Sequence, residues 1–141
     1  MKADTSILEI SSIEPNMQRE LADLLIRVVE DGASIGFIPP LGIEEALQYW
    51  GEVCQPGVLL LVALIEGKIV GTVQLHLAMK KNASHRAEVA KLMVDPGYRK
   101  QGIGRQLMHA IEQVAKTEER SLLVLDTRAG DPSNILYRSL G

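Results

Sequence analysis

The stretch "VDPGYRKQGIGRQLM" (residues 94–108) connects an apolar run that ends at Val94 to a segment that is typical of a helix after Gly104. A Pro-Gly turn and two glycines, Gly102 and Gly104, lie between them. Glycine lacks a Cβ and adopts positive φ readily, so a ligand can approach the backbone closely there. The first N–H groups of a helix have no intrahelical partner and lie at the positive end of its dipole. A strand, a glycine loop and a helix in this order therefore predict an anion site, most naturally for a pyrophosphate.

The charge near this loop agrees with an anion site, although the common nucleotide motifs do not occur. Residues 85–105 hold five Lys or Arg against two acidic residues, whereas the whole chain has a net charge of −3. The P-loop pattern is missing from the sequence, and the dinucleotide fingerprint fails because Leu107 stands where its third glycine belongs. From the glycines alone, a turn that merely caps a surface helix is the alternative.

Hydrophobic periodicity on both sides of the loop predicts strands and helices in a single domain, residues 1–141. The helical segments have apolar residues at spacings of three and four, and the strands are continuous or alternating apolar runs. The predicted order is strand 5–10, helix 14–31, a Gly- and Pro-rich loop 32–42, helix 43–54, strand 58–67, a second strand through Met79, strand 85–94, helix 104–118, strand 121–127 and a last helix from residue 132.

The predicted fold class is α/β, with a mixed, mostly antiparallel sheet flanked by helices. The strands within residues 58–94 are expected to be antiparallel, because a tight turn joins the first two. Strand 85–94, helix 104–118 and strand 121–127 form a βαβ crossover, which places two parallel strands side by side. Alternation in strand 85–94 predicts that one face carries Ala87, Val89, Lys91 and Met93.

Composition narrows the functional classes. An acidic chain with one short basic patch offers few phosphate contacts for a nucleic-acid protein. No apolar run reaches the roughly 20 residues that a membrane span requires, and the N-terminus lacks a signal-peptide pattern. The single cysteine fits a reducing, cytoplasmic location. His76, His85 and His109 lie on separate elements without metal-ligand spacing, so no metal site is predicted and they are interpreted as structural or surface residues.

The loop and the element order together resemble the GNAT superfamily of acetyl-CoA-dependent N-acetyltransferases. The loop pattern of that family, Arg/Gln-x-x-Gly-x-Gly/Ala, is filled here by Arg99, Gly102 and Gly104. The order of strands and helices is also the order in that superfamily, so the resemblance covers nearly the whole chain. Within it, the segments "HRAEVAKLMV" (85–94) and "LDTRAGDPS" (125–133) look most like tabtoxin-resistance-type acetyltransferases.

This resemblance implies that acetyl-CoA is the co-substrate and that backbone amides hold it. In the family, amides of the loop and of the helix start bind the CoA pyrophosphate. The strand before the loop bonds pantetheine near its C-terminal end and supplies an N–H to the thioester oxyanion. Carried over position by position, the cofactor-binding residues are Leu92, Met93, Val94, Arg99, Lys100, Gln101, Gly102, Ile103, Gly104 and Arg105.

Acetyl transfer to an amine needs a base for the amine and an acid for the leaving thiolate. Tyr137 matches the tyrosine of the family's Tyr-x-x-x-Gly and is the candidate acid, since a phenol stays protonated at neutral pH. Asp126, at the end of an apolar strand, and Glu88, within strand 85–94, are rival candidate bases, acting directly or through a water. The alternatives are a buried aromatic of the last helix for Tyr137, a turn-capping carboxylate for Asp126, and a solvated or paired carboxylate for Glu88.

The acceptor side is placed by the resemblance alone. In GNAT proteins the loop between the first two helices covers the acceptor site, which implicates as substrate-binding residues Ser34, Ile35, Gly36 and Phe37. Two positions depart from the family. Gly130 stands where members often have a CoA-contacting Asn, and the sequence ends at Gly141, where members continue with two more strands. Those C-terminal strands are therefore expected to be missing.

The predicted function is an acetyl-CoA-dependent N-acetyltransferase that acetylates a primary amine of a small molecule by direct attack on the thioester. The alternative is a non-catalytic CoA-sensing or partner-binding module of the same fold, which the early end of the sequence favours. Neither nucleic acid nor a membrane is expected as a partner, and a homodimer is compatible with the sequence.

Overall fold

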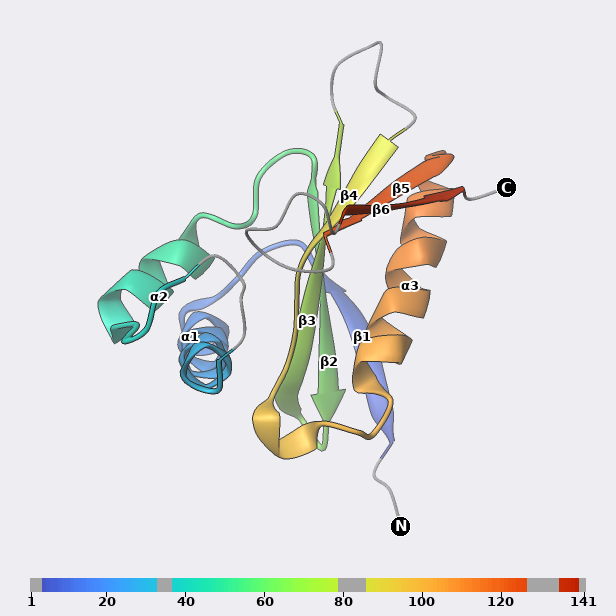
Figure 1. The fold of residues 1–141 in the computed structure, drawn as a ribbon. Helices are drawn as coiled ribbons and strands as arrows, with labels where there is room; N and C mark the ends of the chain where they lie inside the picture. Colours follow the sequence, from blue (N-terminus) through green and yellow to red (C-terminus); the bar gives the residue numbers. More distant parts are fainter. Residues whose placement is uncertain (1–3, 33–36, 79–85, 127–134, 140–141) are drawn as a thin grey trace.

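A six-stranded sheet, in the order β1-β2-β3-β4-β5-β6, forms the centre of the molecule (Figure 1). The computed structural model describes residues 4–32, 37–78, 86–126 and 135–139. Each helix and strand that the sequence predicts before residue 128 is confirmed, with small differences at the ends. The elements are β1 (Thr5–Ile10), α1 (Pro15–Glu30), α2 (Ile43–Gly51), β2 (Val58–Ile65), β3 (Lys68–Leu77), β4 (Arg86–Val94), the short 3-10 helix η2 (Pro96–Tyr98), α3 (Ile103–Thr117), β5 (Leu122–Asp126) and β6 (Ile135–Ser139).

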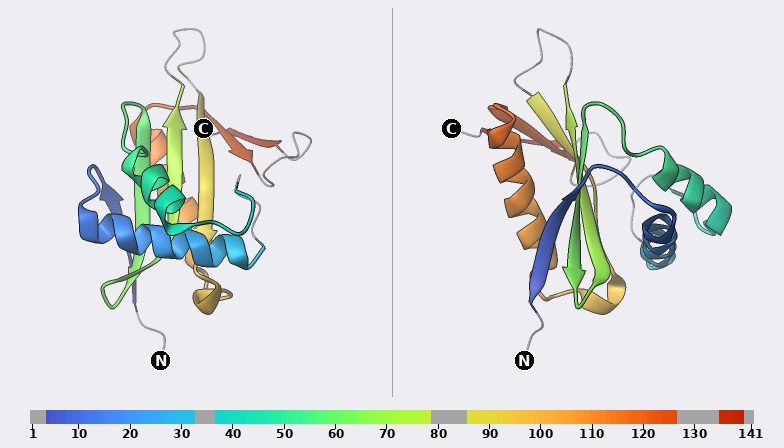
Figure 2. Two further views of the ribbon diagram at one scale, coloured as in Figure 1. Left: turned by 90° about the vertical axis from the view of Figure 1, so that its left-hand side faces the viewer. Right: turned by 180° about the vertical axis from the view of Figure 1, so that it is seen from behind.

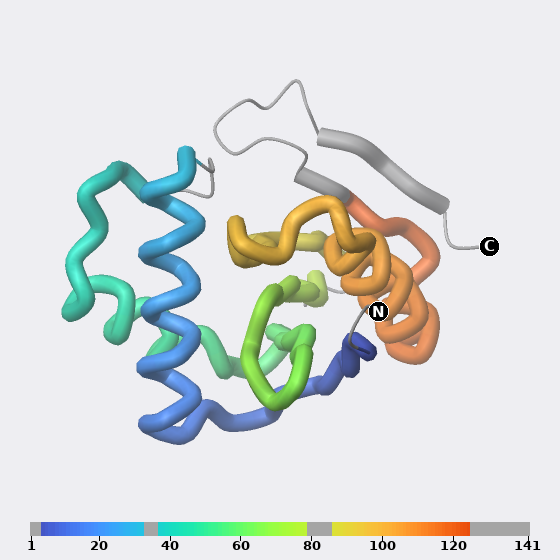
Figure 3. The backbone as a smooth tube through the Cα atoms, turned by 90° about the horizontal axis from the view of Figure 1, so that it is seen from below, coloured from blue at the N-terminus to red at the C-terminus, as the bar shows by residue number. Residues whose placement is uncertain are grey.

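Helices α1 and α2 cover one face of the sheet, and α3 covers the other (Figure 2). Seen from below, the sheet lies between α1 and α3 (Figure 3). Two apolar cores result, because each helix carries an apolar stripe with the helical period. The core under α1 and α2 includes Leu21, Leu24, Leu25, Val28, Trp50, Leu60 and Val62. The core under α3 includes Leu107, Ile111, Ala115, Leu61, Ala63, Val73 and Leu75.

The strand directions agree with the sequence prediction. Pairing is antiparallel from β1 to β4, parallel between β4 and β5, and antiparallel between β5 and β6. The β2–β3 hairpin turns at Glu66 and Gly67, whose φ values are 51° and 80°. Positive φ at both central residues matches the twist of the flanking strands. The connection through α3 forms the expected βαβ crossover.

A β-bulge in β4 corrects the predicted face of that strand. Two residues of β4, Lys91 and Leu92, lie opposite a single residue of β3, and Lys91 has φ 54°. One extra residue shifts the alternation of side chains to the other face. Met93 therefore packs in the core under α1 and α2, whereas Ala87 and Val89 pack in the core under α3. The prediction that these residues share one face is wrong.

The segment after β5 contains a strand where the sequence analysis expects a helix. β6 pairs antiparallel with β5, from Leu122 opposite Ser139 to Asp126 opposite Ile135. This pairing gives partners to backbone groups along the outer edge of β5. Ile and Tyr within "ILYRS" also favour extended structure. Pairing with a distant strand thus overrides the local helical pattern.

The described part of the chain was compared with the requirements of a membrane span and of a metal site. Within it, no helix combines the length and the apolar character that crossing a bilayer requires. The same residues contain no cluster of three or more His, Cys, Asp or Glu side chains that could hold a metal ion.

Candidate functional site

β4 and β5 are paired over only part of their length. Their parallel ladder ends at Val89, and β4 continues from Ala90 to Val94 with no ladder partner on that side among the described residues. Such an edge presents backbone N–H and C=O groups to which an extended ligand can add as a strand would. The predicted cofactor residues at the end of β4 all lie here. The side chain of Leu92 is exposed and that of Met93 is buried.

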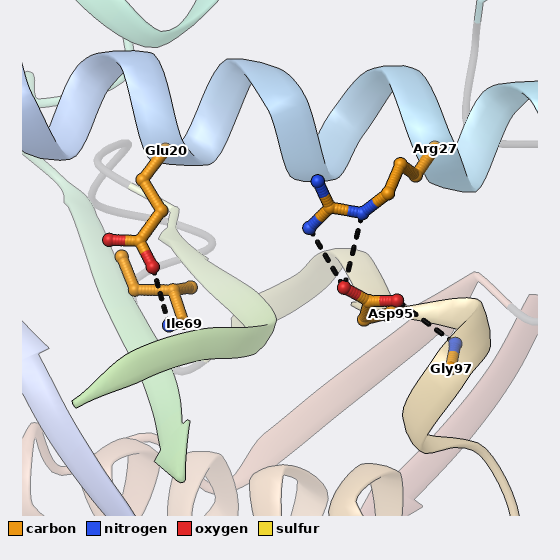
Figure 4. Close-up of polar contacts among 5 residues, drawn as sticks. All are labelled: Glu20, Arg27, Ile69, Asp95 and Gly97. Atoms are coloured by element: carbon orange, nitrogen blue, oxygen red, sulfur yellow. Dashed lines mark hydrogen bonds and ion pairs between the residues drawn. The ribbon is translucent and has the colours of Figure 1, made fainter. Parts of the chain in front are cut away.

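Asp95 organises the turn that leaves β4 (Figure 4). Its backbone N–H donates to the Val70 carbonyl at 2.8 Å, and its Oδ1 accepts the Gly97 N–H at 2.9 Å. Arg27 of α1 donates to Asp95 Oδ2 from Nη2 at 2.8 Å and from Nε at 3.2 Å. The turn is therefore held by α1 and β3 together.

The charge of Asp95 is stabilised where it lies. Burial raises the pKa of its carboxyl, but the Gly97 N–H, the Arg27 guanidinium and nearby Lys68 lower it by more. The net pKa is below the ordinary value, so Asp95 is ionised at neutral pH. Figure 4 shows a second tether of α1, in which Glu20 Oε2 accepts the Ile69 N–H at 2.8 Å.

Helix α3 begins without a side-chain cap. Gly102 is its N-cap residue, with φ 81°, and the Gly102 carbonyl accepts the Gln106 N–H at 3.0 Å. A Cβ at Gly102 would meet no atom within 4 Å, so the backbone conformation, not crowding, favours glycine there. The N–H groups of Ile103, Gly104 and Arg105 belong to the first turn, where no intrahelical acceptor exists. This end of α3 has the chemistry of an anion site.

The predicted side chains of the loop lie mostly on the surface. Arg99, Lys100 and Arg105 are exposed, as is Gln101, whereas the Ile103 side chain is buried and leaves only its backbone for a ligand. Arg99 forms an ion pair with Asp31, the residue that follows α1. The positive charge near the loop therefore comes mainly from residues at its surface, where solvent and salt screen it.

Strand register brings two of the three predicted catalytic residues into one row. Glu88 pairs with His76 of β3 on one side and with Val124 of β5 on the other. Tyr137 pairs with Val124 from β6, so it lies on a strand where the sequence analysis expects a helix. The backbones of Glu88 and Tyr137 are thus two strands apart, about 10 Å. Asp126 lies two residues further along β5.

This row crosses the sheet just before β4 and β5 separate. The side chain of Glu88 is exposed. The structure places the three residues in the fold, and their catalytic roles stay predictions.

Of the predicted acceptor residues, Phe37 is within the described residues, whereas Ser34, Ile35 and Gly36 lie outside them. The Phe37 ring packs edge-on against Tyr49 of α2, with ring centroids 5.2 Å apart. The Lys91 ammonium lies 5.2 Å from the centroid of the Phe37 ring. Phe37 therefore lies beside the bulge of β4, on the face of the sheet that α1 and α2 cover.

A polar row on this face is not predicted from the sequence. Gln74 Nε2 donates to the Tyr49 hydroxyl at 2.8 Å, and Gln74 Oε1 pairs with His76 Nε2 at 2.9 Å. Gln74 is only 2% exposed. The signal in the sequence is two polar residues at positions i and i+2 of an apolar strand, which puts both on one face. Their partner on α2 cannot be identified from spacing.

His76 and Glu88 line a shallow depression of about 340 Å³. Burial lowers the pKa of His76; Glu88 raises it and Lys91 lowers it, and the net pKa is below the ordinary value. His76 is therefore neutral at pH 7. Burial also raises the pKa of Tyr49, against the opposing effect of its hydrogen bond with Gln74. The remaining residues that line the depression are Leu77, Ala78, Arg86, Ala87 and Val124.

Comparison with known proteins identifies relatives of the whole arrangement. The family model described as Acetyltransferase (GNAT) family matches residues 35–141. An N-acetyltransferase from the hisH-hisA intergenic region of Azospirillum brasilense is 28% identical over 128 residues, which cover 89% of this chain and 76% of that protein.

Solved structures confirm the predicted fold class. A GNAT-family acetyltransferase from Staphylococcus aureus MU50 has a TM-score of 0.68 at 19% identity, with 96% of this chain and 100% of that chain covered. An aminoglycoside 6'-N-acetyltransferase complexed with coenzyme A also has a TM-score of 0.68 at 19% identity, with 85% of this chain and 60% of that chain covered.

Proposed function

The chain belongs to the acetyltransferase (GNAT) family, and we propose that it transfers the acetyl group of acetyl-CoA to a primary amine of a small molecule. The observation that carries this proposal is the start of α3, which has no side-chain cap, beside the end of β4, where the described residues form no ladder toward β5. The helix start offers N–H groups to a pyrophosphate, and the strand edge offers N–H and C=O groups to an extended, amide-containing arm. One structural neighbour was solved with coenzyme A bound.

The proposed cofactor site uses backbone more than side chains. The pyrophosphate lies against the loop and the first turn of α3, from Lys100 to Arg105, where Gly102 leaves open space. The pantetheine arm runs along the edge formed by Leu92, Met93 and Val94. Arg99, Lys100 and Arg105 attract the anion from a distance, and this attraction is weakened by salt.

The proposed reaction is direct attack on the thioester. The amine nitrogen forms a bond to the carbonyl carbon, and a backbone N–H of β4 stabilises the oxyanion. The carbon–sulfur bond then breaks, and Tyr137 gives its proton to the leaving thiolate. The proton of the amine goes to a base on the acceptor side, for which Glu88 and Asp126 are the carboxylate candidates, directly or through a water.

The proposed acceptor site lies on the face that α1 and α2 cover. The proposed substrate-binding residues are Ser34, Ile35, Gly36 and Phe37, and of these the described Phe37 forms an aromatic wall with Tyr49 beside the β4 bulge. The tabtoxin-resistance-type resemblance, the cytoplasmic location and the homodimer stay predictions.

The experiment that tests this function measures amine-dependent release of the CoA thiol from acetyl-CoA. The panel contains kanamycin, spermidine, phosphinothricin, L-lysine and L-aspartate, and each amine is compared with a reaction that lacks it. We expect at least one amine to accelerate thiol release and to appear as its N-acetyl product by mass spectrometry. Acetyl-CoA that raises Tm while no amine of a widened panel is acetylated would contradict catalysis and favour a CoA-sensing module.

A further inference from the structure

A hydrogen-bonded row from α2 to β3 fixes one histidine on the proposed acceptor side. Tyr49 Oη accepts from Gln74 Nε2 at 2.8 Å, and His76 Nε2 lies 2.9 Å from Gln74 Oε1. Gln74 is buried, so both ends of its amide need partners, and the two neighbours supply them. Gln74 therefore orients His76, and Tyr49 in turn orients Gln74.

This arrangement selects one tautomer of His76. The amide nitrogen of Gln74 is directed to Tyr49, so its oxygen, which can only accept, faces the imidazole. With the amide oriented in this way, His76 Nε2 carries the hydrogen and donates it. In a neutral imidazole the other nitrogen, Nδ1, is left with a lone pair that can accept a proton.

The surroundings of His76 suit a base for an amine. The charged groups near it are Glu88 and Lys91 of β4, together with Arg86 at the rim of the depression. α2 contributes the neutral Tyr49, and β5 contributes the apolar Val124. Glu88, directly opposite His76 in register, carries the negative charge that attracts an ammonium group and stabilises an imidazolium.

We propose that His76, in place of the carboxylate candidates Glu88 and Asp126, is the catalytic base, which takes the amine proton on Nδ1 while Tyr49 and Gln74 hold its tautomer. This proposal rests on the proposed acetyl transfer. The acceptor ammonium binds beside Glu88 and gives one proton to His76 Nδ1. The freed lone pair forms the C–N bond to the thioester carbonyl, and the C–S bond breaks with its electron pair on sulfur, which takes the proton of Tyr137. The new amide nitrogen releases its second proton, which restores the Tyr137 hydroxyl through solvent, and His76 returns the first proton to solvent.

Burial of the Gln74 amide in an apolar layer costs free energy, and this cost also indicates a function for the row. Gln74 lies in the sheet layer that carries Leu60 and Val62, where an apolar side chain would pack without any need for hydrogen bonds. A buried amide in such a layer is destabilising unless every partner is present. Gln74 has one partner on α2 and one on β3. These two hydrogen bonds give the imidazole of His76 a defined orientation.

The test replaces His76 by Gln, which keeps a hydrogen-bonding amide but cannot titrate near neutral pH. The wild-type kcat/KM is expected to fall as the pH drops below the pKa of His76, because protonation removes the base. His76→Gln should lose this acid limb and about 10²-fold or more of kcat/KM. The Tm increase that acetyl-CoA causes should be unchanged, because His76 lies away from the α3 start. The matched control is His109→Gln, an exposed histidine of α3 on the other face, which should behave as wild type.

A second measurement reports the tautomer without activity. Nitrogen-15 NMR of the imidazole should show His76 protonated on Nε2 and unprotonated on Nδ1 at pH 7.5. Tyr49→Phe removes the hydroxyl that accepts from Gln74, so the amide is free to turn and the spectrum should show a mixture of tautomers. A hydrogen on Nδ1 in the wild type would overturn the proposal.

The kinetic outcomes separate the proposal from the function on which it rests. If the wild type acetylates an amine and His76→Gln keeps both its rate and its acid limb, the role of His76 is wrong and the acetyltransferase function stands. If the wild type acetylates no amine at all, the function and the role of His76 fall together.

Discussion

Gly102 combines a left-handed backbone conformation with a position in the proposed pyrophosphate site. Its φ of 81° starts α3, and the space where a Cβ would be is open. Gly104 differs, because a Cβ there would lie 3.8 Å from Val94 Cγ2, an ordinary van der Waals contact. The two glycines of the loop are therefore not equivalent: Gly102 is required for its conformation, and Gly104 tolerates a methyl group.

We predict that Gly102→Val weakens acetyl-CoA binding by at least about tenfold, because a β-branched residue at positive φ is strained and its side chain fills the open space. Lys100→Ala should cost about 1 kcal/mol or less, since Lys100 is exposed, and its effect should shrink as salt rises. Calorimetric Kd values at low and moderate salt measure both. Gly104→Ala is the control, with a nearly unchanged Kd. Normal acetyl-CoA binding by a folded Gly102→Val variant would show that the loop is only a turn.

Tyr137 is tested by removing one oxygen. Tyr137→Phe should lower kcat more than it changes the Kd for acetyl-CoA, because the hydroxyl acts on the leaving thiolate and not on the pyrophosphate. Steady-state kinetics with the best amine, together with calorimetry, separate the two effects. An unchanged kcat would remove Tyr137 from the role of acid.

Among single residues, those whose signal is their spacing along the chain can be predicted from the sequence. Side-chain contacts between distant elements cannot. The loop residues from Arg99 to Arg105 can be identified because their spacing along the chain is the signal. The hydrogen bond of Gln74 with Tyr49 joins residues 25 positions apart, on different elements. Nothing in the spacing of the histidines distinguishes His76 from His109.

At the scale of elements, α1 supports the loop that leads into α3. Arg27 near its C-terminal end binds the buried Asp95, whose side chain is only 7% exposed, and Asp95 in turn holds the Gly97 N–H (Figure 4). The ion pair joins residues 68 positions apart. α1 therefore helps to define the backbone that the proposed pyrophosphate meets.

We predict that Arg27→Met lowers the free energy of unfolding by about 1–3 kcal/mol, because it leaves a buried carboxylate without its cation. Urea unfolding at pH 7 measures the effect. Arg19→Met is the matched control, because Arg19 and Asp23 form an exposed pair on the same helix, at 3.5 Å, and such pairs contribute little. Equal effects of the two substitutions would contradict the supporting role of Asp95.

The Asp95 carboxyl should also make the free energy of unfolding depend on pH in the acidic range. The folded-state pKa of Asp95 lies below its ordinary value of 3.8, so its stabilisation is complete above that value and is lost as pH falls toward the folded pKa. The stability difference between wild type and Asp95→Asn should be constant from pH 7 to about pH 4 and should shrink below it. A stability difference that increases as the pH falls below about 4 would contradict this prediction.

Helices and strands with clear periods are predictable here, and the irregular elements are not. The face of α1 follows from its spacing of three and four, and the apolar run of β2 follows from burial on both sides. The bulge at Lys91 requires knowledge of what lies opposite in β3, and it moves Met93 to the other core. β6 likewise forms by pairing with β5, which no local pattern reveals.

At the scale of the whole molecule, β4 connects the two halves of the proposed chemistry. Its first residues pair with both β3 and β5, whereas residues 90–94 have no ladder partner toward β5 within the part of the chain that the structure describes. The bulge at Lys91 and Leu92 lies within this last part, next to Phe37 and the polar row on the face that α1 and α2 cover. In the proposed reaction, acetyl-CoA therefore approaches from the start of α3, and the amine approaches from the opposite end of the same strand.

The most direct test of this account is a backbone-amide NMR titration of the nitrogen-15-labelled chain with acetyl-CoA. We expect the largest shifts and the strongest protection from exchange at Gly102–Arg105 and at Ala90–Val94, while the amides of β1 stay unchanged. Binding of acetyl-CoA with shifts confined to other parts of the chain, or no shift at millimolar acetyl-CoA, would contradict it.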